Sequence, residues 1–176
     1  GRMAQAIESR GPDAFGAWDD PDAGIALAHR RLAILDLTPA GAQPMMAGGG
    51  RYVLAFNGEI YNHLELRREL DCFASINWRG HSDTETFLAG FEAWGVEDTL
   101  RRVVGMFAFA LWDSEQRVLT LGRDRFGEKP LYYGWVGQGA GRAFAFASEL
   151  KALRAWPGFG NPVCREALGQ YLRFLY

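Results

Sequence analysis

A group of polar residues that could bind a small substrate centres on the segment Asn57-Gly58-Glu59. An oxyanion hole needs a side-chain amide and an unhindered backbone N–H at the same place, and Asn57 and Gly58 offer both. Arg31 offers a guanidinium for a carboxylate, while Glu59 and Asp83 offer acids for an ammonium group. The set therefore suits the binding of a small zwitterion, although it contains no nucleophile.

Each of these residues also has an ordinary structural explanation. Asn-Gly between two strands is a strong hairpin signal, but here the following segment is helix-like, so a hairpin fits poorly. The pair Arg30-Arg31 could lie on a solvated strand surface. Asp83 could cap a helix or interact with its dipole.

The neighbouring segments predict how these residues are positioned. The apolar run 52–56 indicates a buried strand that ends at Asn57, and residues 62–70 indicate a helix with a capping box from Asn62 to Glu65. A second capping box, from Ser82 to Glu85, begins the next helix. Further strands are predicted at 24–29, 31–37, 106–112, 118–122, 131–136 and 143–147, and further helices at 148–153 and 165–175. Roughly six to eight hairpin-linked strands with grouped helices indicate a layered α+β domain.

Composition limits the classes of function. The 176 residues are 48% hydrophobic and 23% charged, which predicts a single globular domain over 1–176. A formal charge of -2 gives no electrostatic reason to expect nucleic acid or a membrane as a partner. Cys72 and Cys164 are too few and too far apart for a disulfide scaffold or a zinc site. With no apolar span or signal peptide, we expect a cytoplasmic protein that binds no metal.

An ordered set of motifs along nearly the whole chain resembles one known family. Among them are Arg-Gly-Pro-Asp, His-Arg-Arg-Leu, Gly-Ala-Gln-Pro-Met and Ala-Ser-Glu-Leu-Lys-Ala-Leu. The motifs occupy residues 10–13, 29–32, 41–45, 57–63, 82–85, 105–109, 123–133 and 147–153. Together they resemble the class II glutamine amidotransferase domain of glutamine-hydrolysing asparagine synthetase. Two departures from the family's pattern are Ser9 and Ala42, where histidine is common.

The resemblance implies a fold and a reaction. The fold is that of N-terminal-nucleophile hydrolases, a four-layer αββα sandwich of two antiparallel sheets. The reaction is hydrolysis of glutamine to glutamate and ammonia, used by a ligase for ATP-dependent amidation of aspartate. The site residues that it implies are Arg31, Leu32, Ile34, Asn57, Gly58, Glu59 and Asp83.

The resemblance also implies the role of each residue. Arg31 would hold the α-carboxylate of glutamine, with the backbone around Leu32 and Ile34 lining the site. Glu59 and Asp83 would bind the α-ammonium group. The Asn-Gly pair would keep its role as the oxyanion hole, which agrees with the grouping made from the residues alone.

The family's nucleophile is a cysteine at the mature N-terminus, whereas this sequence begins with Gly1. We therefore expect that the first strand with its cysteine, and a synthetase domain after Tyr176, belong to the full gene product. We expect this segment alone to bind glutamine weakly and not to hydrolyse it. The resemblance places ATP and magnesium in the linked synthetase domain and no cofactor in this one, and it is compatible with a homodimer.

Two alternatives remain open from the sequence. The chain could be a non-catalytic glutamine-binding or interaction domain, or an amidotransferase domain that serves a different acceptor, as in relatives of the β-lactam synthetase type. The codons before Gly1 would separate the first alternative from the enzyme, because an initiator Met followed by Cys favours catalysis. The sequence after Tyr176 would identify the acceptor.

Overall fold

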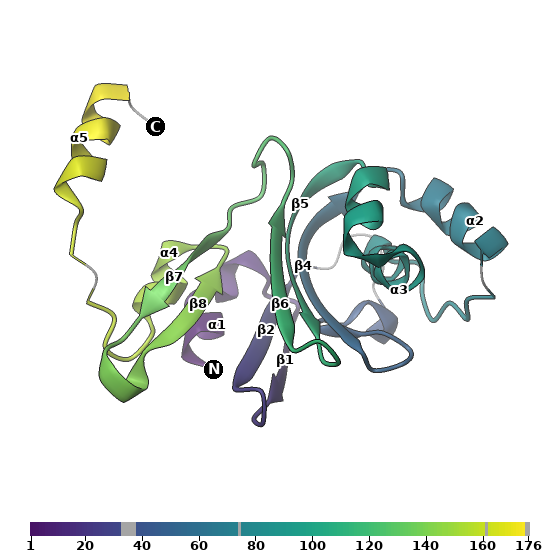
Figure 1. Ribbon diagram of the computed structural model, residues 1–176, viewed down its shortest axis with the longest axis horizontal. Coiled ribbons are helices and arrows are strands. Elements are labelled where there is room, and N and C mark those ends of the chain that lie inside the picture. The colour runs from purple at the N-terminus through teal and green to yellow at the C-terminus, as the bar shows by residue number, and fades with distance from the viewer. Residues whose placement is uncertain (33–37, 74, 161, 175–176) are drawn as a thin grey trace.

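The computed structural model describes residues 1–32, 38–73, 75–160 and 162–174 (Figure 1). Its α-helices are α1 (Arg2–Ala6), α2 (His63–Phe73), α3 (Asp83–Arg102), α4 (Leu150–Arg154) and α5 (Arg165–Phe174), and short 3₁₀ helices cover Glu8–Arg10, Pro39–Gly41 and Gly139–Gly141. The strands are β1 (Ala14–Asp20), β2 (Ile25–Arg31), β3 (Met45–Met46), β4 (Tyr52–Ile60), β5 (Gly105–Asp113), β6 (Val118–Arg123), β7 (Tyr132–Val136) and β8 (Ala143–Ala147).

A four-stranded antiparallel sheet in the order β3-β4-β5-β6 forms the centre of the fold. The longest pairing joins β4 to β5, from Tyr52 opposite Asp113 to Ile60 opposite Gly105. Most residues of both strands are buried, and their sequences are nearly continuous apolar runs, as expected for strands covered on both faces. The sheet therefore separates two hydrophobic cores.

Phenylalanine rings fill the core between this sheet and helix α3. Phe87 and Phe91, four residues apart on one face of α3, pack against Phe56 of β4 and against Phe107 and Phe109 of β5. Ring centroids in this cluster lie 4.4 to 6.1 Å apart in edge-on and tilted arrangements, which suit the aromatic quadrupole. This packing fixes the start of α3 against the central sheet.

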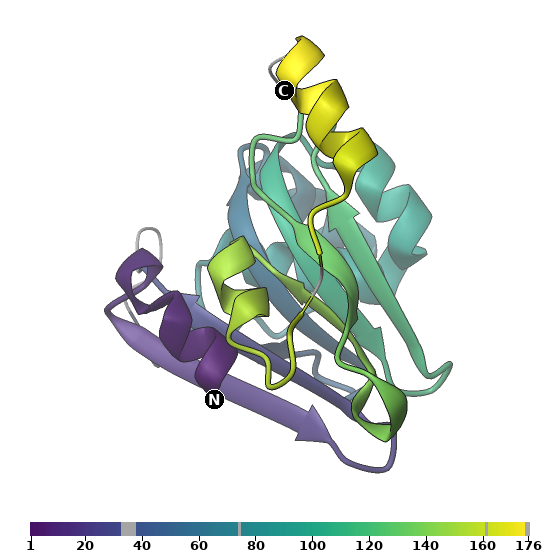
Figure 2. The same cartoon turned by 90° about the vertical axis from the view of Figure 1, so that its left-hand side faces the viewer.

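The other face of the sheet is covered by two hairpins. Leu27 of β2 and the partly buried Trp18 of β1 pack on Trp112 of β5, and Phe146 of β8 joins the same cluster. Beyond the hairpins lie α1 and α4, where Met3 and Leu153 pack with Val136. The order of layers is thus helix, sheet, sheet, helix, which confirms the predicted αββα fold class (Figure 2).

The strands of the structure differ from those predicted in two places, at β1 and at the segment 57–59. Strand β1 was not predicted. The predicted strand 31–37 begins at Arg31, the last residue of β2, and its residues 33–37 lie outside the described residues. The segment Asn57-Gly58-Glu59 lies inside β4, not at its end. A Cβ atom on Gly58 would stand 2.2 Å from the Met106 carbonyl oxygen, so glycine is required by close approach of β5 and not by a turn.

Neither predicted capping box forms in full, although one of the two cap residues does cap its helix. Asn62 does not cap α2 with its side chain. It donates instead to the Arg102 carbonyl and accepts from the Val104 N–H, tying the start of α2 to the end of α3. Ser82 does cap α3, since its hydroxyl accepts from the Glu85 N–H at 3.2 Å. The Glu85 carboxylate, however, binds the preceding loop.

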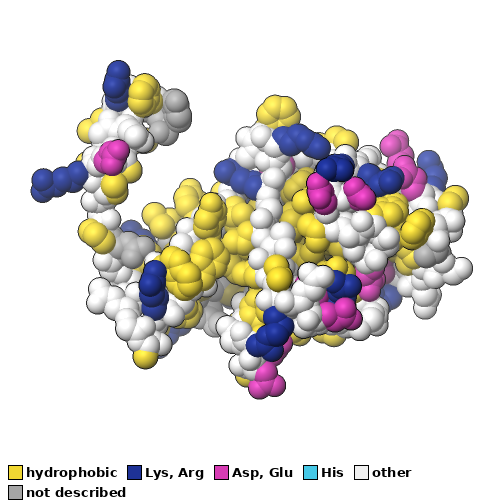
Figure 3. Space-filling model, viewed as in Figure 1, with side chains coloured by type: hydrophobic (Ala, Val, Ile, Leu, Met, Phe, Trp, Pro, Cys, Tyr) yellow, Lys and Arg dark blue, Asp and Glu magenta, His cyan; other side chains and the backbone are white. Residues whose placement is uncertain are grey.

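Hydrophobic side chains remain exposed towards the C-terminal end of the chain. They gather over the β7–β8 hairpin in Figure 3, where Tyr132, Tyr133, Trp135 and Phe144 are exposed. Helix α5 projects away from the layered body, and all of its described residues are exposed (Figure 1). Within the described ranges, no helix has the length and apolar character needed to cross a membrane.

Candidate functional site

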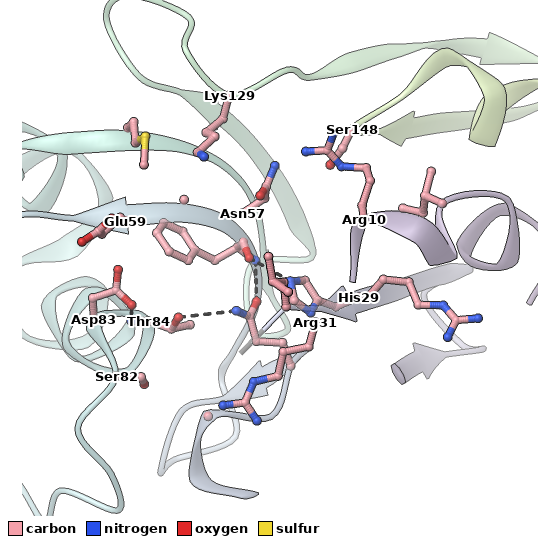
Figure 4. Close-up of a pocket in the computed structure, with 18 of the residues that line it drawn as sticks. Arg10, His29, Arg31, Asn57, Glu59, Ser82, Asp83, Thr84, Lys129 and Ser148 are labelled. Carbon is pink, nitrogen blue, oxygen red and sulfur yellow. Dashed lines mark hydrogen bonds between the residues drawn. The ribbon is translucent and has the colours of Figure 1, made fainter. Parts of the chain in front are cut away.

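A pocket of about 290 Å³ opens between the end of β2, the free edge of β4 and the first turn of α3 (Figure 4). It brings together six of the seven predicted site residues, which are Arg31, Leu32, Asn57, Gly58, Glu59 and Asp83. The seventh, Ile34, lies outside the described residues. The pocket also contains residues to which the sequence assigned no role, among them Arg10, His29, Gln43, Thr84, Lys129 and Ser148.

Beyond its short pairing with β3, the edge of β4 that faces away from β5 is free of strand partners in the described residues. Side chains accept hydrogen bonds from backbone N–H groups on this free edge. The Phe56 N–H donates to Gln43 Oε1 at 2.7 Å, and the Ile60 N–H donates to Asp83 Oδ2 at 2.8 Å. Alternate residues of a strand direct their N–H groups to the same edge, so the Gly58 N–H points in this direction too. Neither β3 nor a side chain of the described residues accepts from it.

The pairing of β4 with β5 explains why the Gly58 N–H makes no hydrogen bond to β5. Phe107, which lies opposite Gly58, directs its own N–H and carbonyl away from β4 and bonds to Asp124. Gly58 and Phe107 therefore form a non-hydrogen-bonded pair, in which the backbones approach closely. The result is a donor that faces the pocket.

Asn57 supplies a second donor at this pocket. Its Nδ2 atom is buried and bonds to nothing among the described residues. Leaving a buried donor unpaired costs about 1–3 kcal/mol, so an amide held in this way is poised to bind a ligand oxygen. Asn57 and Gly58 thus place two donors at this pocket, and their role as an oxyanion hole stays a prediction.

Two carboxylates lie together on the α3 side of the pocket (Figure 4). Asp83 is buried and accepts from the N–H groups of Ile60 and Thr84, both at 2.8 Å. Burial raises the pKa of Asp83 against these two bonds, and the charge of nearby Glu59 raises it further. A bound cation would relieve this repulsion and favour the ionised acid, which is what an ammonium subsite requires.

Arg31 is the last residue of β2 and lies at the rim of the same pocket. Its Nη1 donates to the Thr38 carbonyl at 3.0 Å, which holds the guanidinium beside the cavity. Leu32 follows at the exposed end of the strand. A guanidinium on one wall and two acids on another match the two charges of a free amino acid.

Basic and hydroxyl side chains line the opposite wall. Arg10 reaches this wall beside Ser148 and bonds to Glu149 at 3.1 Å. Lys129 belongs to a loop that the buried Asp124 organises. The Asp124 carboxylate accepts from the backbone N–H groups of Phe107, Phe126, Glu128 and Lys129. Burial would raise the pKa of Asp124, but these four bonds outweigh it and hold the pKa below its usual value.

His29 lines the pocket and holds the edge of β4 through Phe56. Its Nε2 atom lies 3.0 Å from the Phe56 carbonyl oxygen, which identifies the tautomer that carries its hydrogen on Nε2. Burial lowers the pKa of His29 to about 4, although the bond to Phe56 raises it, and the charge of Arg31 lowers it further. The ring is therefore neutral at physiological pH.

The pKa of His29 makes stability depend on pH. In the unfolded chain His29 binds a proton near pH 6.5, and in the folded chain only near pH 4, so stability is lost as pH falls through this window. We expect His29 to account for up to about 3 kcal/mol of this loss. Denaturant unfolding at pH 7, 5.5 and 4 measures it. His29→Gln should flatten the dependence, while His81→Gln on the exposed surface should not; equal slopes in both variants would contradict the assignment.

The two cysteines lie away from this pocket. Cys72 and Cys164 are both exposed free thiols, and neither lines the cavity. In the part of the chain that the structure describes, no group of three or more His, Cys, Asp or Glu side chains could hold a metal ion. The described pocket thus combines donors and charges without a thiol of its own.

The whole chain, residues 1–176, matches the family described as the glutamine amidotransferase domain. The chain belongs to this family. Similar curated proteins include a putative glutamine-hydrolysing asparagine synthetase of Mycobacterium tuberculosis, 41% identical over 99% of this chain. Asparagine synthetase B of Escherichia coli is 42% identical over 93% of the chain. The chain spans 28% and 26% of the lengths of these two proteins.

A solved structure confirms the fold of this amidotransferase domain. Glutamine phosphoribosylpyrophosphate amidotransferase from B. subtilis, complexed with ADP and GMP, superposes with a TM-score of 0.71. The superposition covers 90% of this chain and 40% of that chain at 19% sequence identity. The class of fold predicted from the motifs is thereby confirmed independently of sequence similarity.

Proposed function

We propose that this amidotransferase domain hydrolyses glutamine to glutamate and ammonia, and that the ammonia serves the ATP-dependent amidation of aspartate. One observation carries the proposal. One pocket contains two hydrogen-bond donors, Asn57 Nδ2 and the Gly58 N–H, that have no acceptor among the described residues, and they lie between a guanidinium and a pair of acids. Charges of opposite sign would orient the amino acid, and the donors would then meet its side-chain carboxamide.

In the proposed reaction, a thiolate attacks the carboxamide carbon of glutamine and forms a C–S bond. The carbonyl oxygen becomes an oxyanion, which the Asn57 amide and the Gly58 N–H stabilise. The C–N bond then breaks, and the nitrogen leaves as ammonia after taking up a proton. Water hydrolyses the thioester, which releases glutamate and restores the thiol.

We propose that the thiol is a cysteine at the mature N-terminus of the full gene product. Support comes from the exposure of Cys72 and Cys164, which lie outside the pocket, and from the family to which the domain belongs. An N-terminal cysteine carries its own base, because its α-amine has a pKa of about 8. Mass spectrometry of the protein labelled with an electrophilic glutamine analogue identifies the modified residue.

The acceptor half of the reaction is proposed to lie in a linked synthetase domain. The relatives named as asparagine synthetases are about four times as long as this chain, which leaves room for such a domain. We assign ATP and magnesium to it and no cofactor to this domain. We further propose the cytoplasm as the compartment, in keeping with the free thiols. We also propose a homodimer, which light scattering would detect.

Glu59→Gln tests the proposed function in the protein expressed from its full reading frame. The change keeps the shape of the side chain and removes one charge from the ammonium subsite. We expect KM for glutamine to rise about 10- to 100-fold while kcat stays nearly constant, because a charged hydrogen bond contributes roughly 1.5–3 kcal/mol. Glutamate release is the measurement. Glu65→Gln, exposed on α2, is the matched control.

A substrate analogue sharpens the test. Glutaramate is glutamine without its α-amino group, so the Glu59 carboxylate has no ammonium group to bind. The unchanged protein and Glu59→Gln should therefore differ with glutamine and agree with glutaramate. Equal losses on both substrates would contradict the ammonium subsite. Binding of glutamine without any glutamate release would favour the non-catalytic binding domain.

A further inference from the structure

The side chain of Gln43 joins two walls of the pocket. Its Oε1 accepts from the Phe56 N–H at 2.7 Å, and its Nε2 donates to Thr84 Oγ1 at 3.4 Å (Figure 4). Phe56 directly precedes Asn57 in β4, and Thr84 directly follows Asp83 in α3. One amide therefore connects the strand that carries the oxyanion donors to the helix that carries an acid of the ammonium subsite.

The backbone of Gln43 is itself held in place from two sides. A Cβ atom on Gly16 of β1 would stand 1.9 Å from the Gln43 carbonyl oxygen, so the two backbones are in direct contact. Met45, two residues further on, pairs with Leu54 of β4 and is buried. Little freedom remains in the segment that projects the Gln43 amide into the pocket wall.

The chemistry of the amide suits this position. Phe56 offers a donor and needs an acceptor, which the Gln43 carbonyl supplies. Without Gln43, the Phe56 N–H on the free edge of β4 would lose its bond, and the edge next to Asn57 could shift. Displacements of about 1 Å can cost a catalytic site a factor of about 100.

We propose that Gln43 is a positioning residue for glutamine hydrolysis. It sets the spacing between the oxyanion donors of β4 and the acids that hold the substrate ammonium. Gln43 contacts neither the reacting carbon nor its oxygen in this arrangement and acts through Phe56 and Thr84. The inference rests on the proposed function and adds a residue to which the motif comparison assigned no role.

The test replaces Gln43 by methionine in the protein expressed from its full reading frame. Methionine has a similar length and makes neither hydrogen bond. We expect kcat for glutamate release to fall about 10- to 100-fold and KM to change less, because the alignment of the donors matters most in the transition state. Gln138→Met, at an exposed glutamine, is the matched control and should leave kcat unchanged.

A conservative variant distinguishes positioning from general destabilisation. Gln43→Glu keeps the acceptor for the Phe56 N–H and can accept the Thr84 hydroxyl proton, so it should recover most of the kcat lost in Gln43→Met. Thr84→Val should lower kcat by about threefold and add little to Gln43→Met, since both changes break the same bridge. The midpoint of denaturant unfolding, measured for each variant, shows that the variant is folded.

The outcomes separate this inference from the proposed function. Unchanged kcat in a folded Gln43→Met protein would overturn the role of Gln43 alone. If that variant does not fold, unchanged kcat in a folded Thr84→Val protein would overturn it. Absence of glutamate release from the unchanged protein would overturn the proposed function and the role of Gln43 with it.

Discussion

Replacing Asn57 by alanine is expected to lower kcat for glutamine hydrolysis about 100- to 1,000-fold, because one oxyanion donor contributes roughly 3 kcal/mol to transition-state stabilisation. KM should change by less than about threefold, since the bond forms fully only when the oxyanion develops. The buried Nδ2 atom, unpaired among the described residues, is the observation behind this expectation. Glutamate release by the protein expressed from its full reading frame measures the effect.

Two further variants, one at Asn57 and one at Asn77, show whether the loss comes from the missing donor. Asn57→Asp keeps the size of the side chain but places an acceptor where the oxyanion forms, so its kcat should fall at least as far as that of Asn57→Ala. Asn77→Ala removes an exposed asparagine and should leave kcat unchanged. A fall in kcat of less than about fivefold in folded Asn57→Ala would exclude this amide from the oxyanion hole.

Replacing Glu85 by alanine is expected to lower the free energy of unfolding by about 3–5 kcal/mol. Glu85 is only 7% exposed and accepts from the Arg79 N–H at 2.7 Å, the Gly80 N–H at 3.0 Å and Arg67 Nη2 at 3.2 Å. The change leaves the guanidinium of Arg67, itself largely buried, without its acid, and two backbone donors without acceptors. Denaturant titration followed by tryptophan fluorescence measures the loss.

An ion pair on the same helix provides the control for Glu85. Glu97 and Arg101 are paired four residues apart on the exposed surface of α3. Glu97→Ala should cost less than about 0.5 kcal/mol, because solvent screens exposed pairs. Similar losses in both variants would show that burial is not the reason for the effect. The loop held by Glu85 leads directly into Asp83, so we also expect the Glu85 variant to raise KM for glutamine.

Local signals in the sequence predicted the elements that depend on neighbouring residues. The β5–β6 and β7–β8 hairpins were predicted because each pair of apolar strands is interrupted by a short turn segment. The start of α3 was predicted because Ser82 and Glu85 lie three residues apart, and the cap depends on that spacing. In these cases the deciding interactions lie within a few residues along the chain.

Predictions failed where a distant partner decides the conformation. Asn62 has the residue type and spacing of a helix cap, yet its side chain binds Arg102 and Val104, which are forty or more residues away. The Asn57-Gly58 pair has the residue types of a turn, yet it is extended and belongs to strand β4, because β5 pairs with β4 along this segment. Local propensity is a weak prior that long-range pairing overrides.

The residue types of the proposed site, Arg31, Asn57, Gly58, Glu59 and Asp83, were therefore evident from the sequence, because their chemistry and motif order can be read directly. The tertiary structure decided that they share one cavity and that the two donors of the Asn-Gly pair find no acceptor among the described residues. It also placed Gln43 and His29 on the free edge of β4. Hydrogen bonds between residues 13 and 27 positions apart create that arrangement, and no local pattern along the chain encodes them.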